Sequence, residues 1–327
     1  MSACSVGGPA PATDWSHVSS AADGGGLINL VKAAQREGSV NIPGPPHLLP
    51  DGLAGAFEAR YGVHVNVVGP GIDSTELATP SLDTFDVGVD TAASNTSLFA
   101  PYLVFYWLEI PSSLKNSKAY WYQDCGGYST IGYDPARARP VGSLSDLLLP
   151  EYRSKVALEG SPLEDTEGLS SVMMASLANG GSPESIGPGL DFFHRLVLNG
   201  SLAVYVDENP PVLIAWNGRL PAGYMAFVPS PTVSAYDVQA VNRNAPHPAA
   251  ARLWEEFLFS DEGQNTCLRS SGFPSRMERM RSDGVLDVAA AATLGEPPAD
   301  AVMLTPAQTS AARAYLGAHW TSATEAQ

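Results

Sequence analysis

The sequence is poor in positive charge and has no long apolar run, and each shortage argues against a class of partner. Its 327 residues carry 18 lysines and arginines against 34 aspartates and glutamates, a formal net charge of −16. This imbalance argues against nucleic acid or an anionic membrane surface as the main partner. No run of about 18 apolar residues occurs, so the sequence predicts no membrane-spanning helix.

The sequence also lacks the motifs of common enzyme classes. No G-x-S-x-G elbow, Walker A motif, strand-linked GxGxxG or HExxH is present. The six histidines are scattered, with no metal-ligand spacing between histidine and cysteine. We therefore expect no catalytic residue, no cofactor and no metal site, and we expect that the protein is not an enzyme.

Only three cysteines are present, and none belongs to a CxxC motif. Ser2-Ala3-Cys4, followed by a Gly- and Pro-rich stretch, looks like the end of a bacterial lipoprotein leader. We expect that the leader is missing from this sequence and that Cys4 is lipidated; the alternative is an exposed Cys4 on a disordered tail. Cys125 and Cys267 then form either a disulfide or two buried free thiols. A disulfide needs their Cα atoms within bridging distance, which the sequence does not show, so free thiols are favoured.

The length suits two domains, and the pattern along the chain is that of an α/β protein. Helices are expected at 27–38, 51–62, 73–77, 166–181 and 303–320, with a capped pair within 182–200; strands are expected at 39–44, 63–69, 84–90, 223–230 and 235–242. The stretch 143–160 reads as a short helix, a turn and a strand, and 119–134 as a strand that passes from one domain into another. The alternation of helices and strands in the first third predicts an open, mostly parallel sheet with helices on both faces.

The segment APHPAAARLWEEFLFSDEGQ, residues 245–264, reads as one helix, a break and the start of a second helix. Pro248 suits the first turn of the first helix, and its apolar residues recur at helical spacing. Ser260 is expected to cap the second helix, which has acidic residues in its first turn.

Candidate ligand contacts follow from where ligands bind in open α/β sheets, beyond the carboxyl ends of the strands. These loops and the helix starts that follow them offer unpaired N–H groups and hydroxyls. Aromatic side chains in the inter-domain segments could sandwich an organic ligand, and carboxylates could hold a cation. The candidates are Pro46, Asp73, Ser74, Asp90, Trp121, Tyr122, Asp124, Ser161, Thr166, Trp216 and Tyr236. The alternative for each aromatic is core packing.

The segment 245–264 resembles the closing segment of family 1 extracellular solute-binding proteins, the type 2 periplasmic binding proteins of bacterial ABC importers. AAQREGSVNIPG, GAFEARYGVHVNVV, FDVGVD and YWYQDCGGYSTIGYD resemble other segments of that family in the same order, over roughly residues 28–320.

This resemblance implies two α/β lobes, each an open mixed sheet flanked by helices, joined by crossing hinge strands. Lobe 1 would be 27–122 and 235–285, lobe 2 with the hinge strands 123–234, and the C-terminal helical segment and tail 286–327. The small, polar, Gly- and Pro-rich composition of residues 1–26 itself predicts a flexible tether. The lobes would close on a small ligand and present the closed form to an ABC permease. The protein would be an extracytoplasmic monomer, periplasmic or on the cell surface, held to the membrane only through its lipid anchor.

The ligand is less well defined by the resemblance. Ferric receptors of this group favour adjacent tyrosines as ligands, whereas here Tyr236 is followed by Asp237. Aromatics with Asp86, Asp90 and Asp124 would suit an organic amine, so a polyamine-like solute is favoured over iron(III) or thiamine. The chain is short for the family near 72–85 and 202–224. A binding-impaired paralogue, a ligand sensor and an enzyme on the same fold therefore stay open as alternatives.

Overall fold

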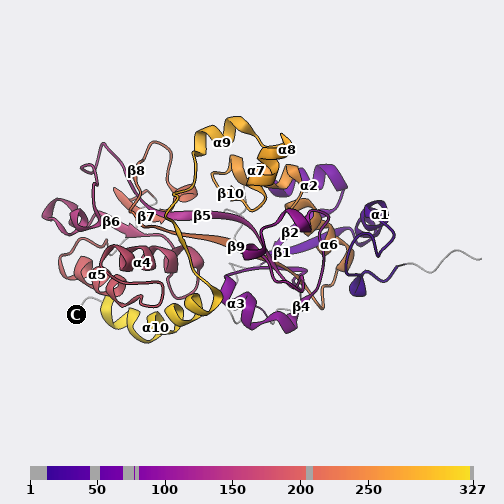
Figure 1. The fold of residues 1–327 in the computed structure, drawn as a ribbon, viewed down its shortest axis with the longest axis horizontal. Coiled ribbons are helices and arrows are strands. Elements are labelled where there is room, and N and C mark those ends of the chain that lie inside the picture. The colour runs from indigo at the N-terminus through magenta and orange to yellow at the C-terminus, as the bar shows by residue number, and fades with distance from the viewer. Residues whose placement is uncertain (1–12, 45–51, 69–76, 78–80, 204–208, 325–327) are drawn as a thin grey trace, which may run out of the picture.

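The computed structural model describes residues 13–44, 52–68, 77, 81–203 and 209–324. Two lobes lie side by side along the longest axis of the molecule, with the strands β5 and β9 running between them (Figure 1). In the ranges that the structure describes, no helix is long and apolar enough to cross a membrane. Cys4, Pro46, Asp73, Ser74 and the helix expected at 73–77 lie outside the described residues, except for Leu77.

Lobe 1 begins with the expected alternation of helix and strand. The elements are α1 (Leu27–Glu37), β1 (Ser39–Pro43), α2 (Leu53–Tyr61) and β2 (His64–Val68). Both helices end at a glycine with left-handed backbone, Gly38 at φ 83° and Gly62 at φ 67°, a conformation that glycine adopts without steric penalty. β1 and β2 pair in parallel, as the alternation predicts.

The next strand is shorter than expected. β3 (Thr84–Val87) ends before Gly88, and the residues expected to continue it form α3 (Val89–Ser94) instead. A short strand β4 (Phe99–Ala100) follows. Both strands pair antiparallel with β9, so this part of lobe 1 is a mixed sheet rather than a mostly parallel one.

Two long strands connect the lobes. β5 (Tyr122–Tyr133) pairs antiparallel with β9 (Val233–Asn242) over Tyr122–Tyr128 and with β7 (Val212–Trp216) over Ser129–Tyr133. A bulge between Gln123 and Gly126 shifts the β5–β9 register. Each strand thus contributes to both lobes, which confirms the expected crossing strand at 119–134 (Figure 1).

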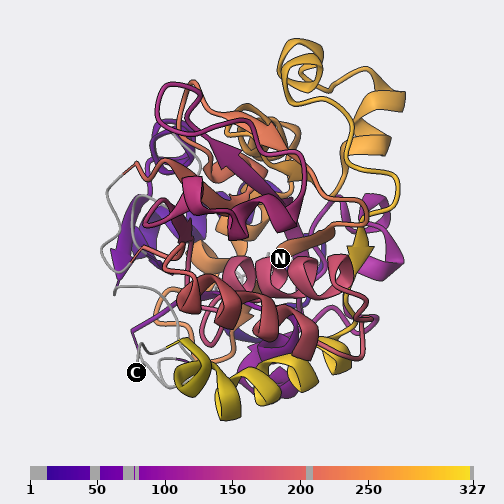
Figure 2. The same ribbon diagram turned by 90° about the vertical axis from the view of Figure 1, so that its left-hand side faces the viewer.

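Lobe 2 packs around its own hydrophobic core. Its elements are β6 (Val156–Leu158), α4 (Thr166–Ala178), α5 (Gly187–Leu198), β7, β8 (Met225–Phe227) and the last helix α10 (Pro306–Thr324). The stretch 182–200 holds one helix, not the expected pair, because Ser182–Ser185 forms a bridged turn. Figure 2 shows α4, α5 and α10 layered on one side of the sheet, and Ala312 and Leu316 of α10 are buried in this core.

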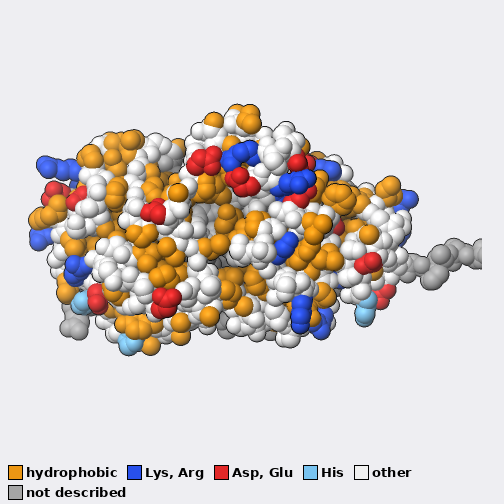
Figure 3. All heavy atoms as spheres, viewed as in Figure 1, with side chains coloured by type: hydrophobic (Ala, Val, Ile, Leu, Met, Phe, Trp, Pro, Cys, Tyr) orange, Lys and Arg blue, Asp and Glu red, His pale blue; other side chains and the backbone are white. Residues whose placement is uncertain are grey.

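The chain returns to lobe 1 after β9. The returning elements are α6 (Pro248–Leu258), α7 (Asp261–Arg269), β10 (Phe273–Pro274), α8 (Met277–Asp283) and α9 (Val288–Leu294). The chain then leads back to lobe 2 through β11 (Val302–Met303), which pairs in parallel with Val233 and Ser234 of β9. Among the described residues the short 3₁₀ helices are η1 (Trp15–His17), η4 (Thr96–Leu98), η5 (Trp107–Glu109), η6 (Ser112–Leu114), η7 (Leu144–Leu148), η8 (Pro150–Tyr152) and η9 (Asn217–Arg219). Charged side chains gather over α8 and α9, where Arg281 bridges Glu278 and Glu296 (Figure 3).

The segment 245–264 has the predicted form, since α6 ends at Leu258 and Ser260 caps α7, which begins at Asp261. The Ser260 hydroxyl accepts a hydrogen bond from the Gly263 N–H at 3.2 Å. Trp254 and Phe257 of α6 are buried against Phe57 of α2, with ring centroids 5.1 and 5.5 Å from the Phe57 ring. This packing holds α6 and α2 together in lobe 1.

Replacing Ser260 by alanine is expected to lower the free energy of unfolding by about 1 kcal/mol, because one orphan N–H of α7 loses its cap. Urea unfolding followed by circular dichroism measures this. Ser260→Asn, which keeps a capping oxygen, is the control and should stay close to wild type. An alanine variant as stable as wild type would show that the cap contributes nothing.

Residues 13–26, part of the tether predicted from composition, pack against lobe 1. Trp15 is buried in its core. Arg252 of α6 donates hydrogen bonds to the carbonyls of Val18 at 3.0 Å and Ser16 at 3.2 Å. The described part of the N-terminal segment is therefore anchored to α6.

Candidate functional site

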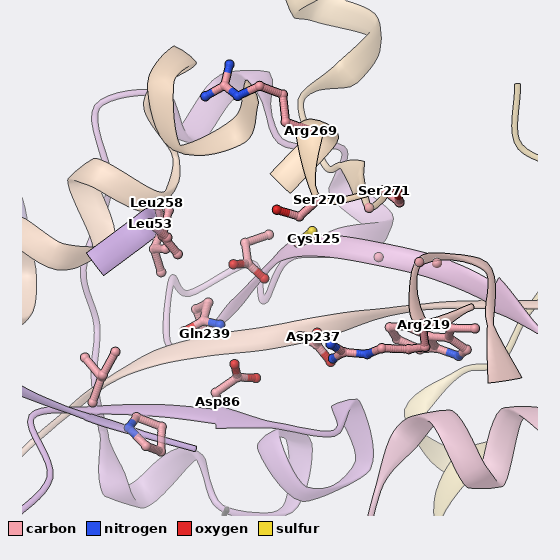
Figure 4. A pocket seen from close by; sticks show the side chains of 18 of the residues that line it. Leu53, Asp86, Cys125, Arg219, Asp237, Gln239, Leu258, Arg269, Ser270 and Ser271 are labelled. Atoms are coloured by element: carbon pink, nitrogen blue, oxygen red, sulfur yellow. The ribbon is translucent and has the colours of Figure 1, made fainter. Parts of the chain in front are cut away.

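A cavity of about 390 Å³ lies between the lobes, at the crossing strands (Figure 4). Lobe 1 gives it an apolar wall of Ile42, Pro43, Leu53, Trp254 and Leu258. Strands β3, β5 and β9 give it a polar floor of Thr84, Asp86, Asp124, Asp237 and Gln239. Lobe 2 contributes Trp216, Gly218 and Arg219, and the remaining lining residues are Cys125–Gly127 and Arg269–Gly272. The volume is that of a small-molecule site.

Three aspartates from three neighbouring strands share the floor. Asp86 of β3 lies opposite Gln239 of β9 in the antiparallel register. Asp237 is two residues from Gln239 on the same strand, so both side chains point to the same face. Asp124 follows the start of the bulge in β5. Figure 4 shows the side chains of Gln239 and Asp237 along β9, with the side chain of Asp86 beside them on β3.

Crowding of these carboxyl groups in a buried setting raises their pKa values. Burial, with Asp124 nearby, raises the pKa of Asp86 to about 7. Burial, with Asp237 nearby, raises the pKa of Asp124 to about 8. Burial, with Asp86 and then Glu167 nearby, raises the pKa of Asp237 well above its ordinary value. The Gln239 amide partly offsets the shifts of Asp86 and Asp124. The floor thus resists full ionisation and would be stabilised by a cation.

Arg219, a cation that lines the cavity, is already paired. Its Nη2 lies 3.4 Å from Oε1 of Glu167 at the start of α4. Burial opposes its charge, but Glu167, Asp237 and Glu159 together raise its pKa. Burial raises the pKa of Glu159 to about 7 despite Arg219. Arg269 at the cavity edge pairs with Asp287 at 3.4 Å. Both arginines are paired with a carboxylate, and Arg219 also lowers the pKa of Asp86 and Asp237, so it offsets part of the charge of the floor.

The cysteines beside the cavity correct the expectation of free thiols. Cys125 and Cys267 form a disulfide with Cα atoms 6.0 Å apart. β10 pairs with β5, with Pro274 opposite Cys125, and this pairing brings the end of α7 over β5. Gly272 fits beside the bridge because a Cβ there would collide with the Cys125 sulfur. The pairing depends on strand register, which the spacing of the cysteines does not reveal.

No protein-family model and no curated protein matches the sequence. Solved structures do match the fold. The chain is similar to the periplasmic binding protein AgtB of A. tumefaciens R10 in complex with agropinic acid, with TM-score 0.68, 16% identity, and coverage of 88% of this chain and 98% of that one. It is also similar to iron-bound HitA of Pseudomonas aeruginosa, with TM-score 0.63, 17% identity and coverage of 85% and 97%.

A third match is a putative spermidine/putrescine ABC transporter protein of Listeria monocytogenes, with TM-score 0.66, 12% identity and coverage of 87% and 99%. The chain has the type 2 periplasmic-binding-protein fold. In this fold the cavity lies between the two lobes, where the sequence analysis expected the ligand.

Two of the predicted contacts line the cavity of this periplasmic-binding-protein fold. They are Asp124 on β5 and Trp216 at the end of β7. Asp90 lies elsewhere, where its Oδ2 accepts a hydrogen bond from Nε of Arg313 at 2.8 Å. Thr166 begins α4, and the Ser161 N–H donates to the Asp165 carboxylate in the loop before that helix. A ligand contact at Asp90, Ser161 or Thr166 stays a prediction.

The aromatic candidates other than Trp216 have packing roles. Trp121 is buried in the core beneath β3 and β9. The Tyr122 ring packs edge-on against Phe259, with centroids 4.9 Å apart. Tyr236 is adjacent to Asp237 on β9, so its side chain points to the opposite face, where it packs against apolar residues. The three rings are packed in the core, and a ligand contact at Trp121, Tyr122 or Tyr236 stays a prediction.

Several lining residues are not among the predicted contacts. Asp237 and Gln239 alternate on a strand that is otherwise apolar at its centre, and this period-two pattern marks them as one face. Asp86, which was expected to suit an organic amine, lies beside them through the pairing of β3 with β9. Arg219 carries no such signal, because it lies in the short helix η9. In the part of the chain that the structure describes, no group of three or more His, Cys, Asp or Glu residues is arranged to hold a metal ion.

Proposed function

We propose that this protein is the extracytoplasmic solute-binding protein of an ABC importer and captures a small organic cation, with a polyamine-like solute favoured over iron(III) or thiamine. The fold supports the proposal, since the matching structures include periplasmic binding proteins and a putative spermidine/putrescine transporter protein. We further propose that it is not an enzyme and works as a monomer, extracytoplasmic and lipid-anchored through Cys4.

The observation that carries the choice of ligand is the cluster of three aspartates on the cavity floor. Burial first, and then their mutual repulsion, raises their pKa values, and a bound ammonium group would stabilise their ionised form. An ammonium group also has several N–H donors, and a cluster of carboxylate oxygens can accept hydrogen bonds from them.

The rest of the cavity favours an organic cation over a bare metal ion. Leu53, Leu258 and Ile42 form an apolar wall opposite the acidic floor, which suits methylene groups. Trp216 and Trp254 also line the cavity, and aromatic faces attract organic cations. Tyr236, the one tyrosine at the position where ferric receptors carry a pair, points away from the aspartates.

Closure of the lobes is the proposed mechanism. β5 and β9 contribute to both lobes, so bending of these two strands would move the lobes relative to each other. A ligand held by the floor, by lobe 1 and by Trp216 of lobe 2 would bind the closed form more tightly and shift the population toward it. We retain, as part of this proposal, lobe 1 as 27–122 and 235–285 and lobe 2 as 123–234.

A thermal-shift and calorimetry panel of putrescine, spermidine, thiamine, ferric citrate and glucose tests the proposal. We expect the amines to raise the melting temperature of the wild type. Asp237→Asn should weaken amine binding roughly 10- to 100-fold, because it removes a hydrogen bond to a charged group. The same change should stabilise the unliganded protein, because it removes one of the carboxyl groups that repel each other.

Asp191→Asn is the matched control, because Asp191 is an exposed aspartate on α5 and should leave binding and stability unchanged. If no amine raises the melting temperature, or if the Asp237 variant binds amines like wild type, the proposed ligand class is wrong. Hydrolysis or conversion of a bound solute would instead favour the enzyme alternative. Binding of the closed form to a receptor kinase but not to a permease would favour the sensor alternative.

A further inference from the structure

Glu255 is a buried acid that has no role in the proposed function. It lies on α6 and is 0% exposed. Among the described residues, neither of its carboxylate oxygens has a hydrogen-bond partner. Its neighbour Glu256 differs, since it accepts hydrogen bonds from the Tyr102 hydroxyl and the Phe105 N–H, each at 2.8 Å. Glu256 therefore has a structural role, whereas Glu255 lacks one.

The position of Glu255 on α6 places it next to the cavity. Trp254 and Leu258 of the same helix line the cavity wall. Leu258 is three residues after Glu255, and residues at this spacing are neighbours on a helix surface. Burial raises the pKa of Glu255 well above its ordinary value, and Asp124 and then Asp86 raise it further, so its carboxyl group is within electrostatic range of the cavity floor.

Other side-chain groups near this end of the cavity also lack partners. Among the described residues these are the Tyr122 hydroxyl, Oδ1 of Asp124 and Oγ1 of Thr84. Asp124 and Thr84 line the cavity, and Tyr122 lies opposite the lining residue Gln239 in the β5–β9 register. Glu255 raises the pKa of Tyr122 after burial does, so the charge of Glu255 acts on this hydroxyl. Buried polar groups are normally hydrogen-bonded, so a partner is missing here.

We propose that Glu255 and the Tyr122 hydroxyl form an inner subsite behind the α6 wall of the cavity, which binds the second ammonium group of an elongated diamine. This inference rests on the proposed function, in which the aspartates of the floor hold the first ammonium group. The apolar side chains of Trp254 and Leu258 would lie along the methylene chain between the two charged ends. The subsite then makes the second charge of the ligand a determinant of specificity.

Putrescine and 1-butylamine test the inner subsite, because they share a four-carbon chain and differ in the second ammonium group. Isothermal titration of the full chain is made with both probes on wild type, Glu255→Gln, Tyr122→Phe and Glu256→Gln. Wild type should prefer putrescine about tenfold or more, the effect of one charge-assisted hydrogen bond. Glu255→Gln should cut this preference below about threefold, mostly by weakening putrescine binding, and Tyr122→Phe should reduce it in the same direction.

Glu256→Gln is the matched control, since Glu256 is the adjacent buried acid and is already paired; it should keep the wild-type preference. Circular dichroism verifies that each variant is folded, and Glu255→Met replaces Glu255→Gln if the latter is not. If wild type does not discriminate between the probes, or if Glu255→Gln and Glu255→Met keep the preference, the inner subsite is wrong while the proposed ligand class stands. If wild type binds neither amine, both the ligand class and the subsite are wrong.

Discussion

Replacing Cys125 and Cys267 together by serine is expected to lower the free energy of unfolding by about 4–5 kcal/mol, because the bridge closes a long loop in the unfolded chain. The two cysteines are 142 residues apart. Urea unfolding of the oxidised wild type, the reduced wild type and the double variant measures the loss. Reduction of the wild type should reproduce most of it.

Cys4→Ser is the control for this experiment, since it removes a cysteine that takes no part in the bridge, and it should be as stable as wild type. The bridge also borders the cavity through Cys125 and fixes the strand that carries Asp124. We therefore expect reduction to weaken ligand binding as well as stability. Equal stability of the oxidised and reduced proteins would contradict the assignment of the bridge.

The unliganded protein is expected to lose stability as the pH rises from 5 to 8, by an amount on the order of 4 kcal/mol, because a pKa change of one is worth about 1.4 kcal/mol. In the folded state the pKa is about 7 for Asp86 and about 8 for Asp124, against a usual 3.8. Across this window the folded state therefore holds more protons than the unfolded state, so each rise in pH favours unfolding. Urea unfolding at each pH measures the trend.

A bound amine should flatten this pH dependence, since its positive charge stabilises the ionised aspartates. Asp237→Asn should also flatten it, because one repelling carboxyl group is removed, whereas the exposed control Asp191→Asn should follow wild type. Stability that is constant or rises between pH 5 and 8 would show that the aspartates are not held in repulsion.

Much of the fold can be predicted from local signals in the sequence. Gly38 and Gly62 mark the ends of α1 and α2, and Ser260 marks the start of α7, because left-handed glycines and hydroxyl caps act within one turn of a helix. The resemblance of several segments, taken in order, adds the two-lobed arrangement and the crossing strands.

The remaining features depend on contacts between distant parts of the chain. The antiparallel pairing of β3 with β9 joins residues more than a hundred positions apart, and it alone places Asp86 beside Gln239 and Asp237. The disulfide depends in the same way on the β10–β5 register. Of the predicted contacts, Asp124 and Trp216 line the cavity because they lie on the crossing strands and at the end of β7, whereas Asp90 pairs with an arginine from the last helix.

That arginine connects the two halves of the molecule. α10 is packed in the core of lobe 2, and its Arg313 donates a hydrogen bond at 3.1 Å to the Leu163 carbonyl beside α4. The same guanidinium binds Asp90 of α3, which packs in lobe 1. The lobes are therefore tied by an ion pair as well as by the chain segments that cross between them. Any widening of the cleft that pulls α3 away from α10 must break this pair, and because both side chains are largely buried we expect dissolved salt to weaken it only slightly.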